Sequence, residues 1–320
     1  MTTLTTTTTK ALVVTAAVAL LAACGGSGGD GDKSQTGRLK LSITDAPMDD
    51  VDAVWVKFSA VEFKPEAGAP VLNTLATPQS LNLLELQNGR TAVLVNDVVL
   101  PAGRYEWIRL VVDNVPNVRD SYVMADGMEC ELTVPSGAES GLKMNRGFTL
   151  TAGGSVALTA DFDLRKSLHA PPGQKSMIGM CTQGFLLRPT LRLVQDSEVG
   201  AIAGTVDPSR RSAVGCERMV YVFADGQNAP NSTTPDDDDG LGVEPLVMVK
   251  ADGSTGAYKV TFLPSGNYTV AYTCAVDELG VDDSLDVPPF AFDSDKQGAT
   301  VRPNLITTVN FGPLTPPPAN

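Results

Sequence analysis

The sequence predicts an all-β protein built from two antiparallel β-sandwiches in tandem. From Arg38 onward, short segments alternate apolar with polar residues, as Leu39, Leu41 and Ile43 do, and a period of two is typical of strands with one buried face. Gly, Pro, Asn and Asp separate these segments, and no long helical period occurs. The pattern stops at residues 195–198 and then restarts. Short strands divided by turn signals favour sandwiches or barrels.

Most of the expected strands lie in the first half of the chain, at residues 39–43, 54–58, 105–112, 121–124, 131–134, 148–150, 155–164 and 185–194. A short helix is expected around residues 81–86 or 92–95. The strands expected in the second half lie at residues 200–206, 219–223, 246–250, 258–262, 268–274 and 307–311. A polar insertion at residues 228–240 is expected to form a loop.

The N-terminus has the pattern of a secretory signal. Lys10 precedes an apolar run at residues 11–23, which is too short to span a membrane. The run ends in Leu-Ala-Ala-Cys at Cys24, followed by a glycine-rich stretch. This motif is similar to the site at which bacterial lipoproteins are acylated on cysteine and cleaved before it. The resemblance implies lipidation of Cys24, palmitate included. The alternative is an ordinary secreted protein with a chance cysteine.

The predicted organisation follows from these segments. It comprises a signal peptide (1–23), the lipidated Cys24 with a flexible tether (24–37), a first sandwich (38–196), a second sandwich (197–312) and a Pro-rich tail (313–320). Gly25 follows Cys24 where an aspartate would imply retention in the inner membrane. By resemblance to known lipoproteins, we therefore expect the protein at the cell envelope, in the outer rather than the inner membrane.

The charge of the chain restricts its partners. The formal net charge is -13, and removal of residues 1–23 takes away one cation, Lys10, so the mature chain carries -14. Such acidity argues against nucleic acid and against polybasic attraction to anionic headgroups. Membrane attachment is therefore expected through the lipid.

Lipidation of Cys24 leaves four cysteines, Cys130, Cys181, Cys216 and Cys274. Disulfides persist outside the cytoplasm, and four cysteines allow three pairings. If a domain boundary lies near residue 198, the pairing that keeps each bridge within one domain joins Cys130 to Cys181 and Cys216 to Cys274. Zinc is the weaker interpretation, because the chain has no Cys-x-x-Cys and a single histidine, His169.

One phrase occurs in both halves. Leu-Pro-Ala-Gly-Arg-Tyr at residues 100–105 and Leu-Pro-Ser-Gly-Asn-Tyr at residues 263–268 each lead into an expected strand. Proline presets the first turn residue, and glycine adopts a φ that other residues avoid. We expect the two sandwiches to use the same turn.

A family resemblance rests on motifs in residues 38–194. LSITDAPMDDVDAVWVKFSAVEFKP, LNLLELQNG, LPAGRYEWIRL, LTVPSG, LTADFDLRKSLH and LLRPTLRLV follow one another in order. They resemble domain of unknown function 4382, a family of bacterial and archaeal lipoproteins. The resemblance implies an exported, sandwich-like domain and no particular reaction.

The second half resembles the carboxypeptidase regulatory-like (transthyretin-like) fold. The residues concerned are GAIAGTV at 200–206, ADGSTGAYKVTFLPSGNYTV at 251–270 and TTVNFG at 307–312. The resemblance implies a structural or binding appendage. Both expected domains are thus sandwiches of the immunoglobulin/transthyretin-like kind.

Calcium is the metal that the sequence favours. Asp45, Asp49, Asp50 and Asp52 crowd one loop between two expected strands, and hard cations take several oxygen ligands from a flexible turn. The alternative is turn chemistry, in which Asp45 caps its own turn and the other aspartates are solvated. No other cofactor is expected.

Aromatic residues offer a second candidate site. Tyr105 and Trp107 are expected to share one face of their strand, and Trp55 is expected to face outward, opposite Val54 and Val56. If exposed, Trp55, Tyr105 and Trp107 would form a platform for carbohydrate; alternatively they pack a covered face of the sheet. Methionines near Cys130, Cys181 and His169 favour core filling over copper binding.

The sequence therefore predicts a binding or adhesion module at the cell envelope, with a glycan or an envelope protein as its partner. An enzyme is not expected, since nucleophilic triads need a base and His169 is the sole histidine. The alternative is a calcium- or carbohydrate-binding lipoprotein that uses the loop from Asp45 to Asp52. The third hypothesis is a hydrolase, because two carboxylates suffice for a glycosidase.

Overall fold

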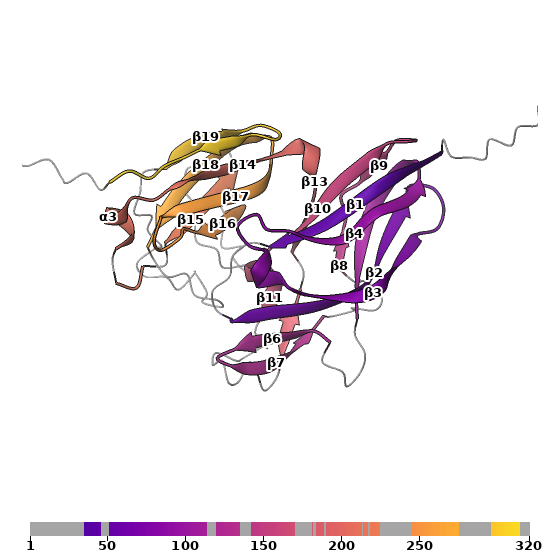
Figure 1. Ribbon diagram of the computed structural model, residues 1–320, viewed down its shortest axis with the longest axis horizontal. Coiled ribbons are helices and arrows are strands. Elements are labelled where there is room, and N and C mark those ends of the chain that lie inside the picture. The colour runs from indigo at the N-terminus through magenta and orange to yellow at the C-terminus, as the bar shows by residue number, and fades with distance from the viewer. Residues whose placement is uncertain are drawn as a thin grey trace, which may run out of the picture. The chain divides into compact units, whose positions relative to one another are not determined.

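The computed structural model describes residues 35–45, 51–113, 120–134, 142–169, 181, 184–188, 190–212, 214–216, 218–224, 245–274 and 296–313 (Figure 1). The expected signal peptide, Cys24 and the Pro-rich tail from residue 314 lie outside these ranges. Within them, no helix is both long and apolar enough to cross a membrane.

Strands dominate the first half of the chain. They are β1 (Thr36–Asp45), β2 (Ala53–Pro65), β3 (Val71–Asn82), β4 (Ala92–Pro101), β5 (Gly103–Val112), β6 (Tyr122–Ala125), β7 (Met128–Thr133), β8 (Leu142–Met144), β9 (Phe148–Leu150), β10 (Ser155–Phe162), β11 (Leu168–His169), β12 (Phe185–Leu187) and β13 (Leu191–Gln195). The short helical turns are η2 (Leu83–Leu86) and α1 (Leu164–Ser167).

The second half is built in the same way. Its strands are β14 (Val199–Thr205), β15 (Met219–Ala224), β16 (Val247–Lys250), β17 (Ala257–Pro264), β18 (Gly266–Thr273), β19 (Gln297–Val301) and β20 (Ile306–Thr308). Two helical turns, η3 (Asp196–Glu198) and α3 (Pro208–Arg211), accompany them. The predicted all-β class is confirmed.

Two sheets form the first half. One has the order β13-β10-β1-β4, and the other has the path β11-β12-β7-β6-β2-β5-β8 with β3 added on β2 and β9 on β5. Most pairings are antiparallel, but β1 and β10 pair in parallel along eight residues, from Arg38 with Ser155 to Asp45 with Phe162. In Figure 1, β1 is the indigo strand beside β4 and β10.

The two sheets of the first half share one hydrophobic core. Leu41 and Ile43 of β1, Phe58 of β2 and Phe162 of β10 are all fully buried in it. The rings of Phe58 and Phe162 meet edge-on, with 6.4 Å between their centroids. Because these rings come from different sheets, the contact ties the sheets face to face.

The second half has its own two sheets, ordered β17-β14-β20 and β16-β15-β18-β19. Tyr258, Tyr272 and Phe311 pack together in its core. No described strand of one half joins a sheet of the other half. The described residues, from Gln35 onward, belong to one compact unit. The domain limits expected from the sequence stay predictions.

The repeated Leu-Pro phrase builds the same contact twice. Tyr105 Oη donates to the carbonyl of Pro101 at 2.8 Å, and Tyr268 Oη donates to the carbonyl of Pro264 at 2.7 Å. Burial raises the pKa of both phenols. The positive φ expected at both glycines occurs at Gly103 (151°) and not at Gly266. The feature that the two turns share is therefore the hydrogen bond from the tyrosine to the carbonyl of the proline four residues before it.

The structure differs from the sequence predictions at several elements. Residues 92–95 belong to strand β4, because β-branched Val93 and Val95 pair with β1; of the two expected helical segments, only residues 83–86 form a turn of 3₁₀-helix. The single strand expected at 185–194 is two strands in different sheets, β12 and β13. Strands β3, β4, β8 and β19 were not expected. Strand β3 contains Pro78, and proline is tolerated where a strand pairs on one side only.

Candidate ligand-binding cavity

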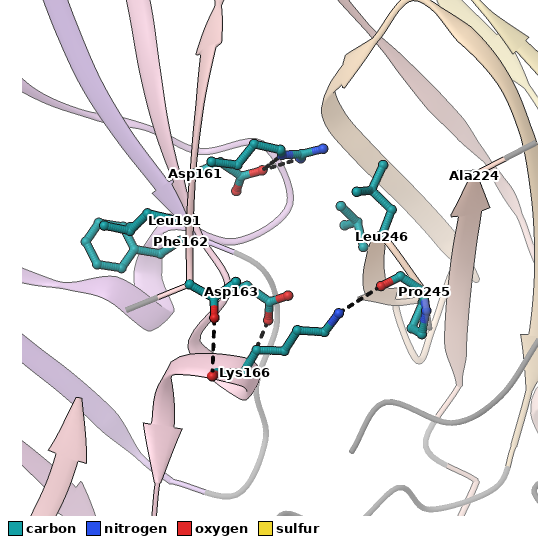
Figure 2. A pocket seen from close by; sticks show the side chains of 11 residues that line it. Asp161, Phe162, Asp163, Lys166, Leu191, Ala224, Pro245 and Leu246 are labelled. Atoms are coloured by element: carbon teal, nitrogen blue, oxygen red, sulfur yellow. Dashed lines mark hydrogen bonds and ion pairs between the residues drawn. The ribbon is translucent and has the colours of Figure 1, made fainter. Parts of the chain in front are cut away.

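A cavity of about 310 Å³ lies where β10 gives way to α1 (Figure 2). Four charged side chains line it, two acidic and two basic: Asp161, Asp163, Lys166 and Arg192. The rest of its wall is mostly apolar and consists of Phe162, Thr190, Leu191, Ala224, Pro245, Leu246 and Val247. Residues from both halves of the chain therefore contribute to one concave site.

Strand alternation and register bring Asp161 to Arg192. Phe162 points into the core, so its neighbour Asp161 faces the opposite side of the sheet. Asp161 is paired with Arg192 of β13, and directly opposed side chains on one face interact. Arg192 Nε donates to Asp161 Oδ2 at 3.2 Å, and Nη2 donates to the same oxygen. The two side chains are only 12% and 23% exposed.

One hydrogen-bond donor of Arg192, its Nη1 group, is not used by Asp161. Its Nη1 atom is buried and has no hydrogen-bond partner among the described residues. Buried polar groups in folded proteins nearly always have a partner, either protein, water or ligand. The guanidinium is therefore fixed on one side by Asp161 and retains a donor on the other.

Asp163 and Lys166 supply the other two charges of the cavity. Asp163 caps α1, accepting from the backbone N–H of Lys166 at 3.3 Å. Lys166 Nζ in turn donates to the carbonyl of Pro245, at 3.1 Å. Figure 2 shows this chain of contacts leading from α1 to the apolar wall at Leu246.

Burial and the basic partners act on these carboxylates in opposite directions. Burial raises the pKa of Asp161, while Arg192 opposes the rise. Burial likewise raises the pKa of Asp163, against the attraction of Lys166. Arg192 thus holds Asp161 in place and Lys166 attracts Asp163, and the two acidic and two basic side chains balance the charge of the site.

No sequence motif predicted a role for Asp161, Asp163, Lys166 or Arg192. Their positions were visible in the strings LTADFDLRKSLH and LLRPTLRLV, and an acidic residue between apolar neighbours on a strand is a usable signal. What the sequence does not contain is the register of β10 on β13, which places Asp161 opposite Arg192.

The aromatic platform is only partly assembled. Trp55 faces outward as expected, is partly exposed, and stacks on Tyr122 with 6.2 Å between ring centroids. Trp107 is partly exposed, and the centroid of its ring lies 4.6 Å from Lys143 Nζ. Tyr105, in contrast, is 1% exposed and its ring stacks on Phe148. Tyr105 therefore offers no face to a ligand.

A β-bulge separates Tyr105 from Trp107. On β2, Lys64 pairs with Trp107 and the next residue, Pro65, pairs with Tyr105, so Glu106 is the extra residue. An extra residue inverts the alternation of side chains beyond it. Tyr105 consequently points into the core with Ile108 and Leu110, and the expectation that Tyr105 and Trp107 share a face was wrong.

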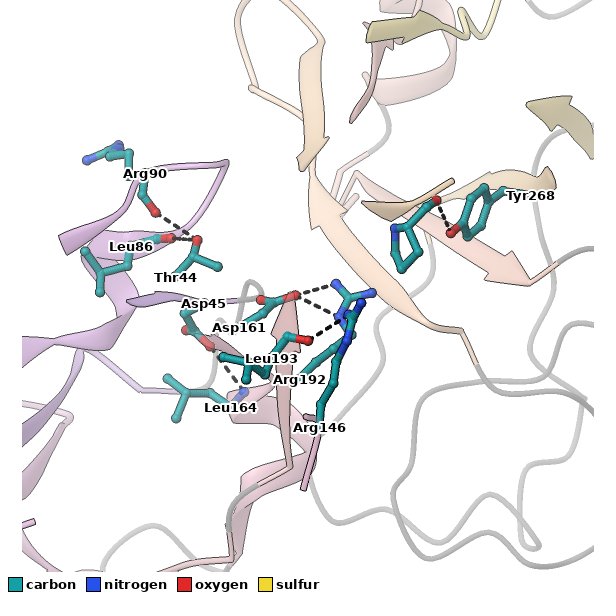
Figure 3. A network of polar contacts seen from close by, with 11 residues as sticks. Thr44, Asp45, Leu86, Arg90, Arg146, Asp161, Leu164, Arg192, Leu193 and Tyr268 are labelled. Carbon is teal, nitrogen blue, oxygen red and sulfur yellow. Dashed lines mark hydrogen bonds and ion pairs between the residues drawn. The ribbon is translucent and has the colours of Figure 1, made fainter. Parts of the chain in front are cut away.

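The acidic loop is described only at its two ends. Asp45 is buried, and its Oδ1 accepts from the backbone N–H of Leu164 at 3.3 Å (Figure 3). Asp52 Oδ2 accepts from the backbone N–H of Gly127 at 3.2 Å. Asp49 and Asp50 lie outside the described residues. Within the described ranges, no group of three or more His, Cys, Asp or Glu side chains is placed to hold a metal. Calcium binding by the loop stays a prediction.

The structure contains both expected disulfides, Cys130–Cys181 and Cys216–Cys274. The Cα atoms of the two pairs are 4.5 Å and 4.4 Å apart. Each bridge therefore stays within its own half of the chain.

Residues 36–180 match the family model described as a domain of unknown function (DUF4382). The match confirms this part of the resemblance and covers less than half of the chain. It does not extend to the second half. No curated protein matches the sequence.

Several solved structures resemble the chain weakly. The Bacillus anthracis TIE protein is 12% identical with a TM-score of 0.21, and the match covers 86% of this chain and 33% of that protein. The minor pilin GBS52 of Streptococcus agalactiae is 9% identical with a TM-score of 0.20, over 88% of this chain and 99% of the pilin. The shaft pilin SpaA of Lactobacillus rhamnosus GG is 11% identical with a TM-score of 0.20, over the same shares. This chain thus spans about a third of the length of the TIE protein. Likeness at this level carries no argument about function.

Proposed function

We propose that this chain is a non-catalytic, lipid-anchored module of the cell envelope that binds a saccharide in the cavity at Asp161 and Arg192. The observation that carries the proposal is the buried Nη1 of Arg192, a donor without a partner among the described residues. A ligand oxygen that reaches this atom through a small movement of the Arg192 side chain would satisfy it.

The chemistry of the wall selects the class of ligand. A hydroxyl both donates and accepts, whereas a carboxylate accepts only and a guanidinium donates only. A ligand with several hydroxyls can therefore serve Asp161 and Arg192 together. Leu191, Leu246 and Val247 supply an apolar surface for the C–H face of a sugar ring.

The charged groups of the cavity are suited to holding a ligand. Asp161 is fixed by Arg192, and Lys166 is fixed by the carbonyl of Pro245. Groups that are already oriented lose little entropy when a ligand binds.

The proposed location of the protein is the cell envelope. Lipidation of Cys24 would attach the chain to the membrane, because an acidic chain gains nothing from anionic headgroups. The outer membrane is the proposed location because Gly25, and not an aspartate, follows Cys24. The glycine-rich residues 25–34 would act as the tether, which is shorter than the sequence predicted because Thr36 and Gly37 belong to β1. We assign the second half to the carboxypeptidase regulatory-like class, as an appendage that supplies Pro245 and Leu246 to the wall of the cavity.

A glycoside hydrolase is the second candidate, favoured by two carboxylates with raised pKa in one cavity. A general acid needs such a raised pKa. Against it, Asp161 accepts two hydrogen bonds from Arg192, which hold it as a carboxylate.

The test is a glycan array probed with the full chain, purified in detergent. Wild-type protein should bind a subset of saccharides, and Arg192→Met should lose that binding. Arg38→Met is the matched control, because Arg38 pairs with Asp97 at an exposed position of the same sheet. Equal binding by wild type and Arg192→Met would contradict the proposal. Release of a reducing end from a bound saccharide would instead identify the hydrolase.

A further inference from the structure

A second cavity, of about 480 Å³, differs from the first in its charge. Three basic side chains line it, those of Arg218, Lys250 and Lys259, against one acidic side chain, Asp252. The remaining lining residues are Gln87, Asn88, Ala251, Gly253, Ala257 and Tyr258. In a chain with a net charge of -13, this excess of positive charge in a concave site is unusual.

The one carboxylate of this cavity, that of Asp252, accepts hydrogen bonds from the turn that follows it. Asp252 Oδ1 accepts from the backbone N–H groups of Ser254 and Thr255, at 3.0 and 2.7 Å, and from both their hydroxyls. These bonds hold the pKa of Asp252 far below its usual range. Its negative charge is therefore permanent and directed at the turn, and no ion pair joins it to Arg218 or Lys259 within the described residues.

The backbone holds Arg218 in an unfavourable conformation. Its φ is 62°, in the left-handed region that residues other than glycine seldom adopt. Its carbonyl accepts from the N–H of Ala251 at 2.8 Å, and the next residue, Met219, pairs with Lys250. This pairing places Arg218 beside the end of β16. Backbone strain of this kind is concentrated at functional sites.

The guanidinium of Arg218 is only partly satisfied. Nη1 donates to the carbonyl of Cys216 at 3.1 Å, which is held by the disulfide to Cys274. Nε is buried and has no hydrogen-bond partner among the described residues. Neither Arg218 nor the exposed Lys259 forms an ion pair with any residue of the described ranges.

We infer that this cavity is an anion-binding site for a phosphate ester, formed by Arg218, Lys250 and Lys259. Arginine offers a planar set of donors to a tetrahedral oxyanion, and lysine adds charge from a flexible stem. The volume exceeds that of a bare phosphate ion and leaves room for the group that carries it. The inference is independent of the saccharide proposal, because the two cavities share no lining residue.

Two sources could supply a phosphate ester, a membrane headgroup or a soluble molecule. The test separates them with full-length protein carrying Cys24→Ser, which removes the proposed lipid. One arm titrates inorganic phosphate and glycerol phosphate by calorimetry. The other arm measures flotation with phosphatidylcholine vesicles, with and without phosphatidylglycerol. Binding in the first arm alone indicates a soluble ester, and binding in both indicates a headgroup.

Two variants and a control test the residues. Arg218→Gln and Lys259→Gln should each weaken phosphate binding by about tenfold, the value of one charge-assisted hydrogen bond. Lys40→Gln, at an exposed position of β1, should leave it unchanged. Lys259 is exposed, so its variant should fold even if Arg218→Gln does not. Absence of phosphate binding in the wild type, or equal binding by wild type and Lys259→Gln, would overturn the inference.

Discussion

Replacing Arg192 by methionine tests whether the ion pair of the cavity is as buried as the structure indicates. Methionine keeps the unbranched stem and removes the charge. The side chains of Asp161 and Arg192 are 12% and 23% exposed, and at 3.2 Å their attraction is about 5 kcal/mol for an effective dielectric constant of about 20. Because Asp161 would lose this compensation, Arg192→Met should lower the free energy of unfolding at neutral pH by about 3 kcal/mol.

The pH dependence follows from the raised pKa of Asp161. A raised carboxyl pKa means that the folded state binds the proton more tightly than the unfolded state. The contribution of Asp161 to the free energy of unfolding is therefore most favourable below the pKa of the unfolded state, which is about 4. This contribution falls as pH rises through the pKa of the folded state. Removal of Arg192 takes away the interaction that lowers this pKa. The deficit of Arg192→Met relative to wild type should accordingly shrink toward about pH 4.

Urea denaturation at neutral and acidic pH measures both effects. The exposed pair of Arg38 and Asp97, at 57% and 58% exposure, is the control, and Arg38→Met should cost about 0.5 kcal/mol or less. The double variant Asp161→Leu with Arg192→Met should recover to within about 1 kcal/mol of wild type. An equal cost for Arg192→Met and Arg38→Met would refute the buried-pair reasoning.

Three further predictions concern other parts of the chain. Tyr105→Phe and Tyr268→Phe each remove one hydroxyl bonded to a proline carbonyl and should each lower the free energy of unfolding by about 1 kcal/mol in urea titrations; no loss from either would show that the bond is not stabilising. Cys24→Ser should move the protein from the membrane fraction to the soluble fraction and abolish palmitate labelling, and continued membrane association would contradict the lipid anchor. If the acidic loop binds calcium, the melting temperature should rise with added calcium and fall again with chelator. Asp49→Ala should abolish this rise, and a melt insensitive to calcium would leave Asp45 and Asp52 as turn residues.

The sequence predicted the strands well wherever alternation was uninterrupted. Residues 39–43 fall within β1, and residues 148–150 coincide with β9. The predictions failed where pairing altered the local pattern. A bulge at Glu106 put Tyr105 and Trp107 on opposite faces, and β12 and β13 joined different sheets. Both outcomes depend on contacts between segments distant in sequence, which local periodicity does not encode.

The candidate cavity could not be predicted for the same reason. Asp161 and Arg192 are 31 residues apart, and their contact needs the register between β10 and β13. The disulfides were predictable because few pairings exist for four cysteines, and one pairing alone kept each bridge within a domain. The small number of possible cysteine pairings therefore made the Cys130–Cys181 disulfide predictable. The partner of a given charged residue is not predictable in the same way, because the chain has 24 basic and 37 acidic residues.

Filling the cavity while leaving its charges intact tests the central claim most directly. Leu246 lies in the wall, is partly exposed, and is not part of the ion pair between Asp161 and Arg192. Leu246→Trp should occupy the space that a sugar ring would take and leave Asp161 and Arg192 in place. We predict that this variant melts within a few degrees of wild type and binds none of the saccharides that the wild type retains on an array. Undiminished saccharide binding by Leu246→Trp would contradict the account.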